Sequence, residues 1–208
     1  MGLLKQLNFI KTAQKTESTF TSLLGGDFRL VEYKEPHEYV TMYWEAYQAS
    51  DVKKTNSLNG SIFEIIIETL FYREGLIPFY TQAKAAFVPN VNYDMLLYSH
   101  DEPVSISLKT SLRERYKQAD LEAMALKYVH RRAKCYLMTN DKTEAENVRR
   151  KIAEGDVLGL DDVCYCFSSE LDDLILKLKQ KKFIQSETVD TVKGNMIEHK
   201  EAQMNLGF

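Results

Sequence analysis

An acid and a lysine stand on two neighbouring apolar segments of this chain, where charged side chains are uncommon. Asp94 opens the apolar run 94–98, and Lys109 ends the segment 104–109, in which apolar residues alternate with serines. Patterns of this kind predict strands, so the two residues should project from adjacent strands of one hairpin. A hard divalent cation prefers carboxylate oxygens, and an ammonium group beside it can stabilise charge on a phosphate. The pair therefore suits metal-assisted hydrolysis of a phosphodiester.

Charged residues also mark the segment 113–132, which follows the hairpin and has a helical pattern. Arg113, Glu114 and Arg115 begin it, and Glu122 comes seven residues after Arg115. That spacing returns to the same face of a helix, so Glu122 can face the hairpin. Arginine forks match guanine O6 and N7, and a carboxylate can accept from cytosine N4. The segment could combine a catalytic acid with the reading of G·C pairs.

The elements that must position these residues can be read from periodicity and turn residues. We predict the order helix, helix, three strands, helix, strand, helix, strand and helix, which indicates an α/β layered domain. The ranges are helices at 36–48, 60–72, 113–132, 143–154 and 169–182, and strands at 78–86, 93–99, 103–110, 133–139 and 163–167.

The chain as a whole is expected to form one main domain. With 208 residues, of which 44% are hydrophobic, it can bury a sizeable core at 36–185. Residues 1–35 read as an N-terminal arm and 186–208 as a polar C-terminal tail that is partly disordered or contacts a partner. The sequence contains neither a run long enough to cross a bilayer nor a signal-peptide layout, so a cytoplasmic location is expected. The formal charge of -3 requires that any DNA binding use a local basic surface.

The order of elements, with an acid on the second strand and x-Lys on the third, resembles the PD-(D/E)xK nuclease superfamily. This resemblance implies a restriction-endonuclease-like core of order αβββαβ, with a central mixed sheet flanked by helices. The superfamily pattern places an acid two residues before the lysine, where this chain has Ser107. A serine cannot supply the charge of that acid, so another residue must substitute or the site is inactive.

One group within the superfamily makes such a substitution: the type II restriction endonucleases that read CCGG-like and CCNGG sites (EcoRII type). They carry Ser-x-Lys, then a basic–acidic–Arg triplet and a displaced acid on the following helix. This chain has the triplet four to six residues after Lys109 and Glu122 thirteen residues after it. The resemblance implies that Asp94 and Glu122 hold the metal, and that the triplet 113–115 reads a CC:GG element.

A further acid is expected from the helix at 60–72. Glu64 resembles the superfamily's helix acid, because it completes the pattern Gly-x-x-apolar-Glu that begins at Gly60. Glu68 lies one turn later on the same face and is the alternative. We favour Glu64.

These features together predict a Mg²⁺-dependent type II restriction endonuclease that cuts double-stranded DNA at a short palindromic site containing CC:GG. A palindrome implies a two-fold homodimer in which each subunit reads one half-site. Two alternatives stay open: a structure-selective repair or junction nuclease of the same fold, and a catalytically silent DNA-binding module, which Ser107 would favour. The full recognition site, the position of the cut and the flipping of a central base are not determined by the sequence.

Overall fold

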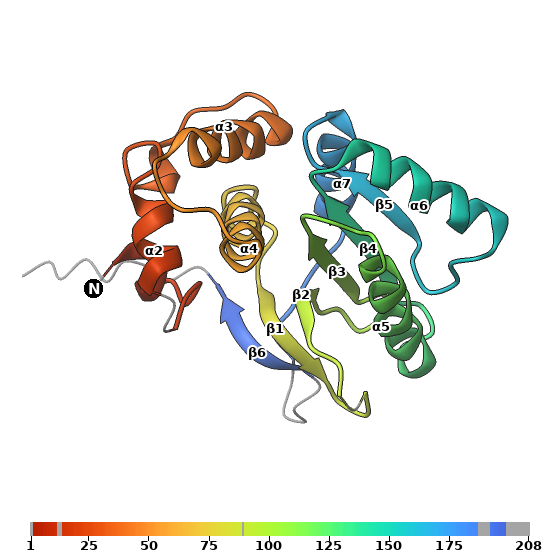
Figure 1. Cartoon of the computed structure of the whole chain (residues 1–208). Coiled ribbons are helices and arrows are strands. Elements are labelled where there is room, and N and C mark those ends of the chain that lie inside the picture. The colour runs from red at the N-terminus through yellow and green to blue at the C-terminus, as the bar shows by residue number, and fades with distance from the viewer. Residues whose placement is uncertain (1, 12–13, 89, 187–191, 199–208) are drawn as a thin grey trace, which may run out of the picture.

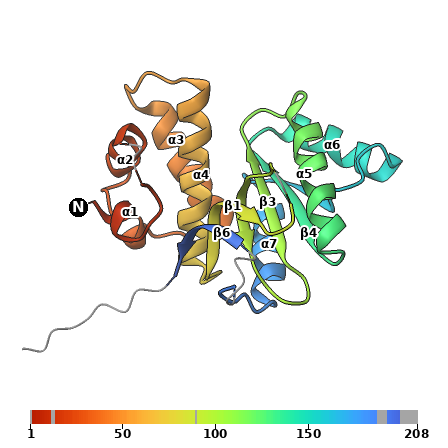
Figure 2. The ribbon, with the colours of Figure 1, turned by 90° about the horizontal axis from the view of Figure 1, so that it is seen from below.

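The computed structural model describes residues 2–11, 14–88, 90–186 and 192–198. A twisted six-stranded sheet of order β5-β4-β3-β2-β1-β6 runs through the centre of the molecule (Figure 1). Helices α1 to α4 lie on one side of it and α5 and α6 on the other, as the view from below shows (Figure 2). No helix within these residues is long and apolar enough to cross a membrane.

The predicted order of helices and strands is confirmed, with boundaries shifted by a few residues. The segment α4–β1–β2–β3–α5–β4 has the αβββαβ order expected of the core. The helices are α1 Leu3–Gln6, α2 Gln14–Thr21, α3 Pro36–Ala49, α4 Asn56–Arg73, α5 Arg115–Val129, α6 Lys142–Glu154 and α7 Ser169–Lys179, with a 3-10 turn at Phe28–Leu30. The strands are β1 Phe79–Ala85, β2 Tyr93–Leu97, β3 Val104–Lys109, β4 Lys134–Thr139, β5 Asp162–Tyr165 and β6 Val192–Ile197.

The sheet is mixed because its two halves are connected differently. β1, β2 and β3 form an antiparallel meander, whereas β3, β4 and β5 are parallel and are joined through α5 and α6. Pairing between β2 and β3 covers three residue pairs and ends at Met95 and Ile106. Asp94, which precedes Met95, and Ser107, which follows Ile106, lie just beyond that last pair, where the two strands stop pairing.

Helix α4 is apolar around most of its circumference and is therefore buried between the sheet and the other helices. It begins four residues before the predicted start at 60, because the Thr55 hydroxyl accepts a hydrogen bond from the Leu58 N–H and caps it. A core on this face joins α3, α4 and α7 to the sheet, and Leu4, Phe9 and Phe20 of the segment 1–35 belong to it. A second core lies on the other face, under α5 and α6.

Strand β6 comes from the segment that we expected to be a polar tail. Its residues 192–197 pair antiparallel with β1 and form the edge of the sheet. Gly194 sits so close to β1 that an added Cβ would lie 2.8 Å from the Thr81 carbonyl oxygen. The segment expected to be a polar tail, partly disordered or in contact with a partner, thus contributes an edge strand, while 187–191 and 199–208 lie outside the described residues.

Candidate active site

Asp94 occupies the point at which β2 and β3 separate. Its Oδ2 accepts three hydrogen bonds: from the Leu108 N–H at 2.8 Å, the Lys109 ammonium at 2.6 Å and the Ser107 hydroxyl at 3.3 Å. The backbone N–H takes part because the ladder has already ended and this donor has no strand partner. No described residue donates to Oδ1, so this oxygen stays available to a ligand.

Lys109 is the counter-charge of Asp94, and the two residues project from adjacent strands of one hairpin, as the sequence predicted. The side chains of both residues are 14% exposed, so the pair is largely withdrawn from solvent. A charge pair at that depth interacts more strongly than one on the surface, because water screens it less. Ser107, which stands where the superfamily has an acid, contributes a neutral hydrogen bond to the same carboxylate. The hairpin alone thus supplies one carboxylate and one ammonium.

Glu122 brings a second carboxylate to this place from α5. It lines a small hollow together with Asp94 and Ser107, and the small residues Ala119 and Ala123 let the helix approach the sheet there. The Tyr93 hydroxyl donates to the Glu122 carbonyl at 3.1 Å and ties the helix to β2. Sequence spacing predicted that this acid would face the hairpin, and the structure brings it there.

The electrostatic surroundings of Glu122 reflect its position. Burial raises the pKa of its carboxyl group. A hydrogen bond from the Gln118 side chain at 2.7 Å and the charge of Lys109 lower that pKa, while the charge of Asp94 raises it. Glu122 is therefore close enough to both residues of the hairpin to respond to their charges.

Glu64 and Glu68 lie on the buried side of α4 that faces β1. Burial, and then the charge of Asp94, raise the pKa of Glu64, and the charge of Lys109 opposes both; the resulting pKa is about 7. The pKa of Glu68 is raised well above its usual range by complete burial, then by the charges of Glu64 and Asp94. Glu64 responds to both residues of the hairpin, which supports the preference for it as the helix acid.

Arg113, Glu114 and Arg115 are exposed at the start of α5. The helix begins at Arg115 rather than at 113, so Arg113 and Glu114 belong to the loop before it. Arg113 has a φ of 28°, a left-handed value that is uncommon for a residue other than glycine. The loop is held by Glu144 of α6, whose carboxylate accepts from the N–H groups of Leu112 and Arg113.

The sequence analysis predicted no role for three residues that support this region: Glu144, Tyr93 and Gln118. Glu144 stands three residues after Asp141, which caps α6, and in that position an acid reads as part of the cap. Its side chain is instead used to hold the loop that carries Arg113. Tyr93 and Gln118 position Glu122, and their contacts depend on the packing of α5 against β2.

The carboxylates of Asp94 and Glu122 supply only part of the ligands that a hard cation needs. Asp94 and Glu122 share one hollow, but within the described ranges no three His, Cys, Asp or Glu side chains converge as a complete metal site. Magnesium commonly keeps several waters and takes one or two protein carboxylates together with substrate phosphate oxygens. The donor set is therefore compatible with a cation completed by substrate and water.

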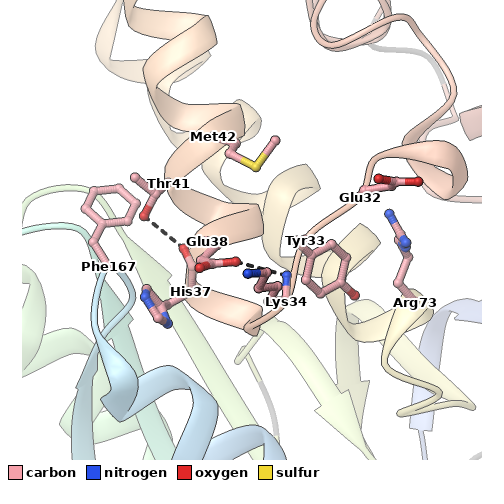
Figure 3. A pocket seen from close by; sticks show the side chains of 9 residues that line it. All are labelled: Glu32, Tyr33, Lys34, His37, Glu38, Thr41, Met42, Arg73 and Phe167. Atoms are coloured by element: carbon pink, nitrogen blue, oxygen red, sulfur yellow. Dashed lines mark hydrogen bonds between the residues drawn. The ribbon is translucent and has the colours of Figure 1, made fainter.

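A hollow of about 980 Å³ lies elsewhere, beside the start of α3 (Figure 3). Two of its charged groups are engaged within the protein: His37 bonds to Asp172 at 2.6 Å, and Arg73 donates to the Phe28 carbonyl at 2.9 Å. None of the residues predicted for chemistry lines it. A concave pocket of this kind suits a small ligand, whereas a DNA duplex is contacted mainly along its phosphate backbone and grooves. The lining residues are Glu32, Tyr33, Lys34, His37, Glu38, Thr41, Met42, Arg73 and Phe167.

Comparison with solved structures identifies the fold. The restriction endonuclease PspGI, in its complex with substrate DNA, matches with a TM-score of 0.51 and 19% identity over 83% of this chain and 83% of that one. Metal-depleted Ecl18kI, in complex with uncleaved, modified DNA, gives a TM-score of 0.42 and 18% identity over 69% of this chain and 52% of that one. No protein-family model and no curated protein matches the sequence. The chain thus has a restriction-endonuclease-like α/β fold.

Proposed function

We propose that this chain is a type II restriction endonuclease that hydrolyses double-stranded DNA with Mg²⁺ as cofactor. The observation that most supports this proposal is that Asp94, Lys109 and Glu122 lie close together where β2 and β3 separate. One carboxylate comes from the hairpin and the other from α5, which replaces the acid missing at Ser107. The fold shared with PspGI supports the proposal.

Each residue has a role that its surroundings allow. Asp94 and Glu122 would hold the cation, which supplies positive charge next to the phosphate. Lys109 is placed to donate to a phosphate oxygen and to help orient the attacking water. Glu64, on the α4 side, completes the outer part of the site as an acceptor for water; its pKa of about 7 makes this role dependent on pH.

Recognition is assigned to the exposed start of α5. Arg113 and Arg115 would donate to guanine O6 and N7, and Glu114 would accept from cytosine N4, within a CC:GG element. Because such an element in a palindrome has two-fold symmetry, we propose that two copies of the chain act together, each on one half-site. The hold of Glu144 on the loop would fix the direction of these side chains.

The test is incubation of the purified protein with a plasmid of mixed sequence, with Mg²⁺ or with EDTA, followed by sequencing of the fragment ends. Discrete Mg²⁺-dependent fragments whose ends share a CC:GG element would support the proposal. The variant Asp94→Asn removes charge at the centre of the site, and Asp156→Asn, at an exposed acid after α6, serves as the matched control. Cleavage is expected from the control and not from Asp94→Asn.

Two other outcomes would contradict the proposal and indicate a different function. Cutting confined to branched or mismatched DNA would indicate a structure-selective repair nuclease of the same fold. Duplex binding without cutting would indicate a silent binding module, in which Ser107 leaves the site without the acid of the superfamily pattern.

A further inference from the structure

Phe87 lies in the connection between β1 and β2, which extends beyond the sheet (Figure 1). Its side chain is 85% exposed, second only to Tyr128 among the large apolar side chains that the structure describes. One exposed apolar residue needs no explanation by itself, but the backbone of Phe87 is also unusual. Its φ of 62° is a left-handed value that is strained for a bulky side chain. The fold thus holds this ring in solvent on a strained backbone.

The turn that carries Phe87 is fixed on both sides. The Val88 N–H donates to the Ala85 carbonyl at 3.3 Å and closes a four-residue turn with Phe87 at its third position. A positive φ at that position is typical of a type II turn, which favours glycine or asparagine there. Ala85 and Val88 are both 6% exposed and belong to the core under α5. Because its neighbours are anchored in this core, Phe87 is presented outward on a rigid support.

This connection lies at the end of the sheet that carries the proposed catalytic residues. β1 and β2 pair as far as Tyr93, and Asp94 follows directly. Because β2 and β3 are antiparallel, the start of β2 lies beside the end of β3, which carries Lys109. The core that anchors the turn also lies under α5, the helix that supplies Glu122. A duplex with a phosphate group at Asp94 would therefore pass close to Phe87.

The surroundings of Phe87 suit a polyanion, although the chain as a whole has a formal charge of -3. The sequence has no aspartate or glutamate between Glu74 and Asp94. An aromatic ring among basic and amide side chains matches a nucleic acid, whose bases stack on the ring and whose phosphates attract the lysine. A protein interface would instead place further apolar residues around the ring. The exposed side chains near the turn are Gln82, Lys84, Asn90 and Asn92.

We propose that Phe87 is a wedge, a side chain that inserts between two adjacent base pairs of the bound duplex and unstacks them. The inference rests on the proposed function, since the duplex is the one held at Asp94, Lys109 and Glu122. Apolar side chains that enter a base step in this way kink the duplex. Because the ring is already held outward in the free protein, it loses little freedom on binding. Phe87 is a positioning residue: it fixes the duplex along the site and does not touch the reacting phosphate.

The bracing of the hairpin supports this role. The Asn92 side-chain amide donates to the Gln82 side chain at 2.6 Å and joins the two strands behind the turn. Gln82 itself has a φ of 48°, at the point where the pairing of β1 with β6 shifts register. Such bulges redirect a strand and are frequent next to active sites. The hairpin is thus aimed and stiffened where the wedge would push against the base pairs.

The test follows base unstacking in duplexes that contain the CC:GG element. Fluorescent analogues of adenine and cytosine, which emit weakly when stacked, are placed at successive positions inside and beside the element. Fluorescence is recorded with the wild-type protein bound in EDTA, so that cleavage plays no part. A rise confined to one base step is expected. A bound complex without a rise at any position would overturn the proposal.

Variants at this position separate the ring from the backbone. Phe87→Ala and Phe87→Gly remove the ring, and both should lose the fluorescence rise. They should also weaken duplex binding by about 10-fold, within the range for loss of one base–aromatic contact. Phe87→Trp keeps an aromatic ring and should retain both properties. Leu176→Ala, at an exposed leucine of α7, is the matched control and should behave as the wild type.

Thermal unfolding without DNA separates a role in DNA binding from a role in the fold. Phe87→Gly should not lower the melting temperature, because glycine adopts a positive φ readily and the ring that it removes is exposed. Normal melting together with loss of the fluorescence rise would support the wedge. A rise that persists in Phe87→Ala and Phe87→Gly would overturn it.

The binding and plasmid assays distinguish a wrong assignment of Phe87 from a wrong function. A wild-type protein that binds the duplex and cuts the plasmid, but unstacks no base, would overturn the wedge alone. A protein that binds no duplex would contradict the proposed function and the wedge with it.

Discussion

The Lys109 ammonium nitrogen lies 2.6 Å from Oδ2 of Asp94, in a pair whose side chains are both 14% exposed. The same oxygen accepts from the Leu108 N–H, which is free because the β2–β3 ladder has ended. The end of strand pairing thus directs three donors to one carboxylate oxygen and leaves the other oxygen for a ligand. The arrangement follows from the backbone as much as from the side chains.

Lys109→Met is expected to reduce cleavage by at least ~100-fold, because it removes a positive charge that would act on the phosphate in the transition state. It should also lower the free energy of unfolding by about 1–3 kcal/mol, since Asp94 loses its counter-charge in a largely buried place. Single-turnover cleavage and urea unfolding measure the two effects. Lys142→Met, at an exposed lysine of α6, is the control. An unchanged cleavage rate would exclude Lys109 from the chemistry.

Glu122→Gln keeps the size of the side chain and removes the second carboxylate of the hollow. Cleavage should fall by at least ~100-fold, because the cation would lose one of its two protein ligands. Specific duplex binding should persist, since Arg113 and Arg115 are unchanged, and gel-shift titration without Mg²⁺ measures it. Glu146→Gln, on the exposed face of α6, should leave both properties unchanged. Full activity of the Glu122 variant would mean that another acid replaces the one missing at Ser107.

The sequence predicted the β2–β3 hairpin and the orientation of Glu122 toward it, because each depends on local periodicity. Alternation over 104–109 places Lys109 on the same side of the strand as Ser107, and helical spacing places Glu122 toward the sheet. These patterns are properties of single elements. They hold wherever an element buries one face, and both elements do so here.

What the sequence could not indicate depends on contacts between distant segments. Strand β6 is stabilised by backbone pairing with β1 and by the packing of Met196 and Ile197 against the two cores, and both contacts join segments that are far apart in the chain. Glu144 was readable only as a cap residue, although its carboxylate holds the loop before α5. Asn195 likewise lies opposite Thr81 because β6 returns to pair with β1.

Glu64 should make the stability of the protein depend on pH. Its pKa is about 7 in the folded chain, above the ordinary value of 4.5, so the unfolded state ionises at lower pH than the folded state. The resulting stability is fully present below pH 4.5 and is lost as the pH rises to about 7. At 1.36 kcal/mol for each pKa unit, the loss amounts to about 3 kcal/mol.

The dependence of stability on pH is measured by urea unfolding from pH 4.5 to 8. EDTA is present, so that no bound divalent cation changes the pKa of Glu64. Glu64→Gln should flatten the decline, and the difference between the two proteins reports Glu64 together with its coupling to Glu68. Identical pH profiles would show that the carboxyl of Glu64 ionises in the folded protein as it does in water.

Arg115→Ala should lower discrimination at one G·C pair by about 1–3 kcal/mol, because a bidentate contact to guanine is lost. The measurement is competition binding of the cognate duplex against duplexes with single substitutions in the CC:GG element, in EDTA at fixed salt. Arg131→Ala removes an exposed arginine just beyond the other end of α5 and should weaken all duplexes alike or none. A uniform loss of affinity with Arg115→Ala would instead assign this arginine to the phosphate backbone, and the reading of G·C pairs would have to lie with other residues.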